Sequence, residues 1–253
     1  MNRILPAAIA LTAALTLAGC TAGAPDSSSP SSPSSASGGT SASDVASIYY
    51  PVALGNTWVY SIDYGSGSTV TDTEVMTAVK PEGDATRVTI SRTFHYEDGS
   101  KDDLLDTVDY LFHADGSLEV PFQSIPSDFG VVTIKSGTMV WPTTAEFDAG
   151  TTRTGTIEAS VDTSGTTTNE KVDFTISGAG TEDVTVPAGS YPGARKLQQA
   201  LVISLPDLGV SGIAINAVTW LAEGVGPVKT ELPDMAGGSA TITQVLVSFT
   251  PGG

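Results

Sequence analysis

Short runs of alternating apolar and polar residues, separated by turns rich in glycine and aspartate, dominate the chain from residue 44 to residue 250. In residues 57–64, the side chains of Trp58, Tyr60 and Ile62 fall on one side of an extended strand. A period of two residues places every second side chain on the same face of a sheet. The sequence therefore predicts antiparallel β-structure with an apolar face.

Runs of this kind recur along the region, whereas the period of an amphipathic helix is nearly absent. We expect about ten to twelve strands in one domain without a tandem repeat. The fold class predicted is all-β: a single large antiparallel, curved sheet in the form of a half-barrel, with a β-sandwich as the second choice. The strands are expected at residues 57–64, 69–80, 85–96, 104–112, 118–122, 155–162, 172–177, 181–186, 194–204, 213–221, 228–232 and 240–249.

Residues 123–150 interrupt this pattern, and Pro126 and Pro142 lie within them. Proline cannot donate a hydrogen bond to a sheet, so it disfavours a central strand. Only residues 131–135 have the composition of a strand. We expect this segment to be a loop or flap that crosses the sheet.

The N-terminus carries an apolar stretch at residues 4–17, preceded by one basic residue, Arg3. At about 14 residues, this stretch falls short of the roughly 20 needed to cross a bilayer, so it is expected to be a signal-peptide core. It ends in Leu-Ala-Gly-Cys at residues 17–20, and Cys20 is the only cysteine in the 253 residues. This arrangement resembles a bacterial lipoprotein signal with its lipobox. The resemblance implies removal of residues 1–19 and a lipid anchor, with diacylglycerol and an acyl chain such as palmitate, on Cys20.

Residues 21–43 consist almost entirely of Ser, Pro, Gly, Ala and Thr, with Asp26 as the only charged residue. Such a composition cannot form a core, so residues 20–43 are expected to be the lipidated cysteine followed by a disordered linker. Residues 44–253 then form the all-β domain. We expect the mature protein in the cell envelope, on the outer face of the cytoplasmic membrane, with an outer-membrane anchor as the alternative.

The charge balance is strongly acidic, because 11 Lys and Arg stand against 28 Asp and Glu, for a formal net charge of −17. A surface of this sign repels phosphate backbones, so nucleic acid is not expected as a partner. The one cysteine leaves no disulfide within the chain. The oligomeric state is left open.

Chemistry-bearing motifs are scarce. The chain lacks the Gly-x-Ser-x-Gly elbow of serine hydrolases and has only two histidines, His95 and His113, which we expect at the surface. Neither a zinc motif nor a dinucleotide fingerprint is present, so no cofactor or metal is expected. The acidic residues between 97 and 109 could offer oxygen ligands to calcium, but they do not have the spacing of an EF-hand loop. Glu146, Glu158 and Glu223 could meet in space as catalytic carboxylates, although nothing in the sequence favours this.

Three stretches together resemble a known group of proteins. They are Tyr-Pro-Val with Gly-Asn-Thr-Trp-Val-Tyr in residues 50–60, Val-Thr-Val-Pro-Ala-Gly-Ser-Tyr at 184–191, and Trp-Leu-Ala-Glu-Gly-Val-Gly-Pro-Val-Lys at 220–229. In this order, over residues 49–232, they are similar to uncharacterised bacterial envelope lipoproteins of the DUF3108-type and LolA/LolB-like curved-sheet group. The resemblance implies an incomplete barrel whose concave face encloses an apolar cavity.

The resemblance further implies a non-catalytic, membrane-anchored lipoprotein that binds a lipid or another apolar ligand in this concave face. Five aromatic side chains are the expected ligand-facing residues: Trp58, Tyr60, Phe94, Tyr110 and Trp220. The same residues could instead fill a solid core. In that case, the protein would be a cell-surface interaction or structural module that binds another envelope protein. A hydrolase with acids converging in a cleft is the third class.

Overall fold

The computed structural model describes residues 47–64, 69–97, 99, 104–121, 131–163, 165–233 and 241–253. Cys20 and the expected linker lie outside the described residues. The strands are β1 (Thr57–Asp63), β2 (Thr69–Glu82), β3 (Ala85–Tyr96), β4 (Leu104–His113), β5 (Leu118–Val120), β6 (Val131–Ser136), β7 (Met139–Trp141), β8 (Thr152–Thr163), β9 (Thr166–Val186), β10 (Gly189–Leu205), β11 (Val210–Ala222), β12 (Gly226–Pro233) and β13 (Thr241–Thr250). A short helix, α1 (Thr144–Asp148), and a 3-10 turn, η2 (Pro206–Leu208), complete the described elements.

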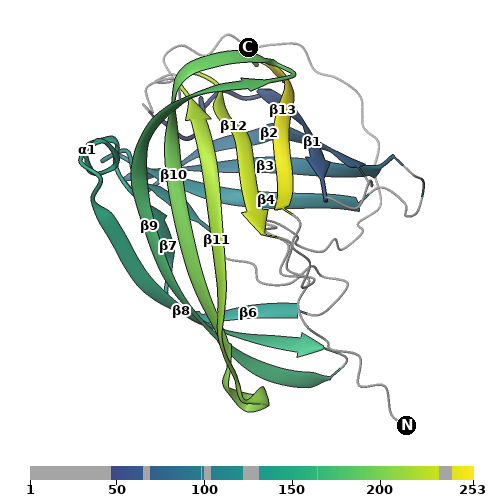
Figure 1. The fold of residues 1–253 in the computed structure, drawn as a ribbon, viewed down its shortest axis with the longest axis vertical. Helices are drawn as coiled ribbons and strands as arrows, with labels where there is room; N and C mark the ends of the chain where they lie inside the picture. The colour runs from purple at the N-terminus through teal and green to yellow at the C-terminus, as the bar shows by residue number, and fades with distance from the viewer. Residues whose placement is uncertain are drawn as a thin grey trace, which may run out of the picture.

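All of these strands belong to one 13-stranded antiparallel sheet, in the order β6-β8-β9-β10-β11-β12-β13-β1-β2-β3-β4-β5-β7. The sheet has two edges, β6 and β7, and does not close into a barrel. Figure 1 shows how it curls: the long strands β8 to β11 sweep around one side, while β2 to β4 run crosswise behind them. The prediction of a single large, curved antiparallel sheet is confirmed, and the β-sandwich is not formed.

The first and last strands meet in the middle of this sheet. β1 pairs with β13, and Thr57 lies opposite Thr250. The sheet is therefore built from two meanders, β1 to β5 and β8 to β13, joined along that pair. Because the chain's first and last strands are both internal, neither presents an unpaired edge.

The segment that the sequence analysis treats as a loop or flap joins the two edges of the sheet. Residues 123–130 lie outside the described residues, but β6 extends the β8 edge and β7 extends the β5 edge. Only residues 137–138 separate β6 from β7. The chain therefore crosses the gap between the two edges here, and residues 131–150 do not form a lid over the sheet.

Gly137 makes this crossing possible. Its φ is +89°, and a Cβ atom at this position would lie 2.1 Å from the carbonyl oxygen of Thr156 in β8. Only glycine combines a left-handed conformation with so close an approach to a neighbouring backbone. The link between the edges therefore depends on one residue without a side chain.

Helix α1 follows β7 and is missed by the sequence analysis because it is only five residues long. Thr143 and Glu146 form a capping box that fixes its first turn, and Phe147 is buried. The helix packs against β9 where Gly178 leaves room, since a Cβ there would lie 2.2 Å from the carbonyl oxygen of Phe147. The two strands expected at residues 172–177 and 181–186 are in fact a single long strand, β9, whose register with β10 shifts between Gly178 and Thr181.

Buried side chains fill the curved sheet in two clusters. The larger contains most of the aromatic residues, among them Trp58, Tyr60 and Trp141. The smaller lies near one end of β1 and includes Ile62 and Phe94. Within the described part of the chain, no helix has the length and apolar character needed to cross a bilayer.

Substitution of Gly137 by alanine is expected to destabilise the fold by about 3 kcal/mol or more, because strain at positive φ adds to a backbone clash. Gly165→Ala is the matched control, since Gly165 has a similar φ of +82° but nothing within 4 Å of its Cβ position. Urea denaturation of the two variants then separates the clash from the strain. Equal losses in both variants would show that the contact with Thr156 is unimportant.

Candidate functional site

Residues 47–56, which precede β1, cross one end of the curved sheet. The Tyr49 hydroxyl donates a hydrogen bond to the carbonyl oxygen of Pro142, and its ring meets the edge of Trp141 with centroids 5.1 Å apart. Tyr50 makes a similar edge contact with Trp58, with centroids 5.5 Å apart. The segment is therefore attached both to β7 at the sheet edge and to β1 at its centre.

Asn56 ties this segment to the C-terminal end of the chain. Its side-chain amide donates to the carbonyl oxygen of Pro51 at 2.7 Å, and its Oδ1 accepts from the backbone N–H of Gly252 at 2.7 Å. The Asn56 side chain is fully buried and uses both its donor and its acceptor. Residues 47–56 and 251–252 are thus held side by side.

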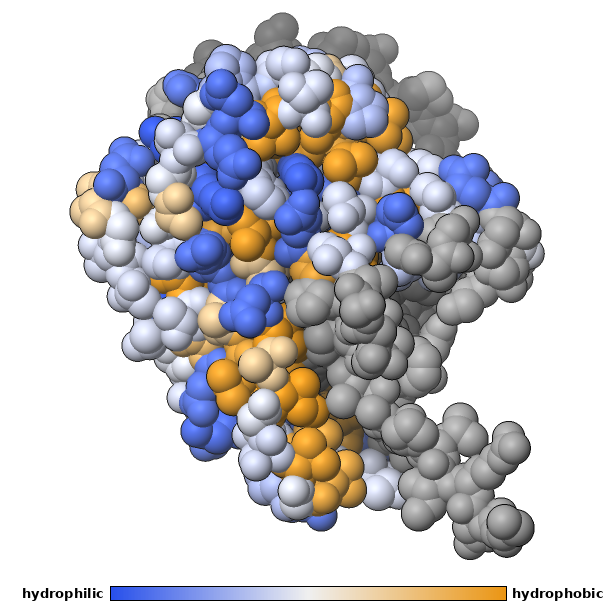
Figure 2. Space-filling model, viewed as in Figure 1, coloured by the Kyte–Doolittle hydropathy of each residue, from blue (hydrophilic) through white to orange (hydrophobic). Residues whose placement is uncertain are grey.

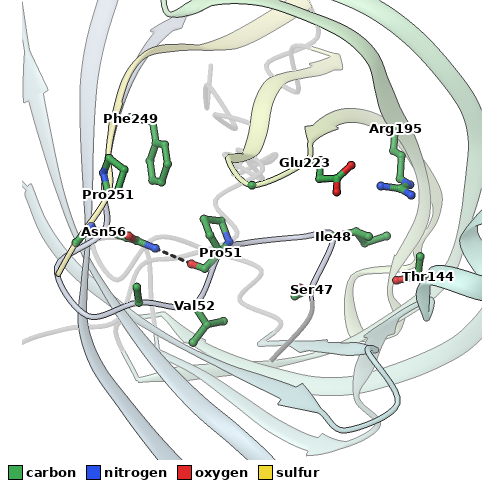
Figure 3. A pocket seen from close by; sticks show the side chains of 13 residues that line it. Ser47, Ile48, Pro51, Val52, Asn56, Thr144, Arg195, Glu223, Phe249 and Pro251 are labelled. Atoms are coloured by element: carbon green, nitrogen blue, oxygen red, sulfur yellow. Dashed lines mark hydrogen bonds between the residues drawn. The ribbon is translucent and has the colours of Figure 1, made fainter. Parts of the chain in front are cut away.

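A cavity of about 660 Å³ lies between these segments and the sheet (Figure 3). Its wall is built from residues 47–56, helix α1, strand β10, the turn between β11 and β12, and the end of β13 with the residues after it. This volume is within the roughly 300 to 1,000 Å³ typical of small-molecule sites.

The two sides of the cavity differ in chemistry. Pro51, Val52, Phe249 and Pro251 give one side an apolar wall, and Ile48 lies between the two sides in Figure 3. Phe249 stacks on Trp58 with centroids 5.3 Å apart. Because this wall rests on a packed aromatic residue, it is formed before any ligand arrives.

The other side is polar, with Thr144, Arg195 and Glu223. Arg195 projects from β10, and its Nε lies 3.3 Å from Asp148 Oδ1 at the end of α1. Glu223 is exposed in the turn between β11 and β12. The cavity therefore has an apolar end and a charged end.

The five aromatic residues predicted to face a ligand are all buried, and none lines the described cavity. Trp58 supports the cavity wall from behind, through Phe249 and a 2.7 Å hydrogen bond to the carbonyl oxygen of Val225. The Tyr60 hydroxyl donates to the carbonyl oxygen of Pro227 at 3.0 Å.

The other three predicted residues lie among charged or polar neighbours. The ring of Trp220 lies beneath the ammonium groups of Lys196 and Lys229, at 5.1 and 4.7 Å from its centroid. The Arg92 guanidinium lies 4.6 Å from the Phe94 centroid. Tyr110 packs beside Tyr50. The sequence analysis missed the cavity residues because they come from several elements far apart in the chain and share no sequence pattern.

A second feature missed from sequence is a buried ion cluster on the inner face of β2, β3 and β4. Arg92 contacts Asp72 directly, and its Nε lies 3.0 Å from Glu74 Oε1. Asp106, opposite Arg92 in the register, is also buried. The alternation of residues in β2 could have revealed these buried acids. Asp72 and Glu74 fall on the same face of the strand as the apolar residues Val70 and Met76.

The surroundings of this cluster raise the pKa of two of its carboxyls, Glu74 and Asp72. Three acids share one guanidinium, and Glu74 Oε2 has no hydrogen-bond partner among the described residues. Burial raises the pKa of Glu74 to about 7, although nearby Arg92 acts in the opposite direction. Burial also raises the pKa of Asp72, again against the effect of Arg92. Carboxylates in a desolvated site with too few cations behave in this way.

The remaining candidates for catalysis are spread over different environments. Glu146 is held by Arg153 at 2.6 Å, Glu158 accepts from Ser136 at 3.3 Å, and only Glu223 lines the cavity. His95 is exposed, and His113 Nε2 lies 3.5 Å from Glu119 Oε2.

The acidic residues between 97 and 109 do not share one role. Asp98, Asp102 and Asp103 lie outside the described residues, whereas Asp106 is buried in the ion cluster. Asp109 accepts from Thr89 at 2.6 Å on an exposed face. Across the described ranges, no three His, Cys, Asp or Glu side chains are grouped so that they could hold a metal ion.

The profile of the DUF3108-like family matches residues 65–243, which is more than half of the chain. The chain belongs to the DUF3108-like family. No curated protein is significantly similar to it in sequence. This DUF3108-like chain resembles two solved structures in fold.

The first is a provisionally assigned exported protein with a YmcC-like fold from Bacteroides fragilis, 15% identical, with a TM-score of 0.57 over 81% of this chain and 100% of that one. The second is a provisionally assigned lipoprotein from Parabacteroides distasonis, 16% identical, with a TM-score of 0.59 over 80% of this chain and 98% of that one. At these identities, the similarity establishes the fold of the DUF3108-like chain alone.

Glu74 is expected to make folding stability fall as the pH rises from about 5 to 8. Its ordinary pKa is 4.5 and its folded pKa is about 7. Over this range, the folded protein keeps a proton that the unfolded chain has released, so the contribution is complete below about pH 4.5 and is lost as the pH rises through about 7. Glu74→Gln should flatten this slope in urea denaturation measured at several pH values.

The matched control is Glu82→Gln. Glu82 is exposed, and its pKa is lowered by its hydrogen bond with Arg87. This variant should leave the slope above pH 5 unchanged. If the slope in Glu74→Gln is as steep as in the unsubstituted protein, Glu74 is not the titrating group.

Proposed function

We propose that the protein is a non-catalytic exported lipoprotein, anchored through Cys20, that binds an apolar ligand at one end of its curved sheet. The observation that carries this proposal is the cavity of about 660 Å³ with one apolar wall. Its place would be in the cell envelope, on the outer face of the cytoplasmic membrane.

Two independent features support an envelope location. The Leu-Ala-Gly-Cys motif at residues 17–20 follows an apolar stretch of signal-peptide length. Proteins of the same fold from two other bacteria carry provisional assignments as an exported protein and as a lipoprotein.

The construction of the apolar wall supports ligand binding. Phe249 and Val52 are held by their packing and by the Asn56 hydrogen bonds to the adjacent backbone. A wall that is already ordered loses little conformational entropy on binding, so more of the burial energy appears as affinity.

A second candidate function is an interaction module that binds another envelope protein. At the end of the molecule where β10 and β11 are joined, Leu208 is 62% exposed and Val202 is 38% exposed. Figure 2 shows apolar surface at this end, the lower one in the view. It is the far end of β10 from Arg195, so the two candidate functions use different regions.

Cys20→Ser is expected to abolish lipid attachment, because the thiol is the acceptor for diacylglycerol. The full chain, expressed in a bacterial host with labelled palmitate, should carry label and fractionate with membranes. The Cys20→Ser chain should do neither, whereas Ser43→Ala should behave like the unsubstituted chain. Label retained in Cys20→Ser would contradict the proposed anchor.

Ala53→Trp is expected to weaken ligand binding at least tenfold, because it places a large side chain in the cavity. The measurement is calorimetric titration of the full chain with monoacylglycerols and fatty acids. Ala114→Trp, in an exposed turn, is the control and should leave affinity unchanged. Absence of binding to the unsubstituted chain would overturn the ligand-binding proposal and favour the interaction module.

A further inference from the structure

The charged end of the cavity is formed by one positive and one negative side chain, which do not form an ion pair with each other. In Figure 3, the side chains of Arg195 and Glu223 project toward one another from β10 and from the β11–β12 turn. No ion pair joins them, and Glu223 makes neither an ion pair nor a hydrogen bond with any described residue. Arg195 makes one contact there, from Nε to Asp148.

The bonding of Arg195 differs from that of nearby cations. Lys196, Lys229 and Arg153 lie 3.0, 2.6 and 2.6 Å from their carboxylate partners. The single contact of Arg195 is longer, at 3.3 Å, and leaves both terminal nitrogens of the guanidinium without a partner among the described residues. These nitrogens form the planar fork that binds phosphate or carboxylate through two parallel hydrogen bonds.

Glu223 sets a second requirement. A ligand with a purely anionic headgroup would meet the Glu223 carboxylate and a chain of net charge −17. A purely cationic headgroup would meet Arg195. A headgroup with both a positive and a negative group can place its anion against Arg195 and its cation against Glu223. The Thr144 hydroxyl, which also lines the cavity, adds a neutral hydrogen-bonding group.

We propose that the cavity selects single-chain amphiphiles with a zwitterionic headgroup. The phosphate or carboxylate of the headgroup binds Arg195, its ammonium binds Glu223, and the acyl chain lies along Val52 and Phe249. The volume of about 660 Å³ lies within the range of sites that bind small molecules. This inference rests on the proposed function and specifies the ligand class of the same site.

The test is calorimetric titration of the full chain with three probes of equal acyl length. These are lysophosphatidylethanolamine, lysophosphatidylglycerol and monoacylglycerol, which are zwitterionic, anionic and neutral. The zwitterionic probe should bind at least tenfold more tightly than either of the others. An Nε-acyl-lysine, which replaces the phosphate by a carboxylate, then distinguishes the two sources of negative charge.

Variants identify the residues. Arg195→Gln should lower the affinity for lysophosphatidylethanolamine to that for monoacylglycerol, and Glu223→Gln should let lysophosphatidylglycerol bind as tightly as lysophosphatidylethanolamine. Lys80→Gln and Asp84→Asn, exposed at the β2–β3 turn, make the same charge changes away from the cavity and should have no effect. Because Glu223 is exposed, its variant tests the proposal even if Arg195→Gln fails to fold.

The outcomes separate the two proposals. Equal affinity for all three probes would overturn the zwitterionic headgroup while leaving an apolar ligand site in place. Tighter binding of the anionic probe would overturn the role of Glu223. Binding of none of the probes would overturn both this inference and the proposed function.

Discussion

An antiparallel sheet that curls without closing leaves two edges, and the rest of this structure depends on how those edges are held together. Residues 137–138 alone connect β6 on one edge to β7 on the other. Gly137 lies against the β8 backbone, so residues 137–138 stay packed on the sheet. Tyr49 then fastens the N-terminal segment to the same region, through Pro142 and Trp141. Residues 47–56 cross one end of the curved sheet and leave a space between themselves and the sheet, which is the cavity.

The ion cluster constrains the interior in a different way. Glu74 and Arg92 lie opposite each other in the β2–β3 register, between the larger and smaller apolar clusters. A slip of one residue would turn every side chain of a strand to the other face and separate these charges. Partly satisfied buried charges contribute little net stability, but breaking them is costly. The cluster therefore favours one strand register. In return, the folding stability of the protein depends on pH.

The proposed binding site lies outside both the ion cluster and the packed interior of the apolar core. Phe249, which stacks on Trp58, connects the apolar wall of the cavity to the core. The charged groups of the cavity are Arg195 in β10 and Glu223 in the β11–β12 turn. Among the described residues of this acidic chain, Arg195 keeps both terminal nitrogens of its guanidinium without a partner. Because Arg195 lines the same cavity as the apolar wall, the proposed site could bind an acyl chain and its headgroup together.

The sequence by itself determined the all-β class and most strand positions, because side-chain alternation is a local property. Alternation left a curved single sheet and a β-sandwich both open, and the pairing of β1 with β13 decided for the single sheet. The sequence also placed the end of a strand at Val186, where β9 ends, although β10 begins at Gly189 rather than at residue 194. It could not reveal the cavity or the pairing of Arg92 with Asp72 and Glu74. These depend on which strands become neighbours when the sheet curls, and only the tertiary structure decides that.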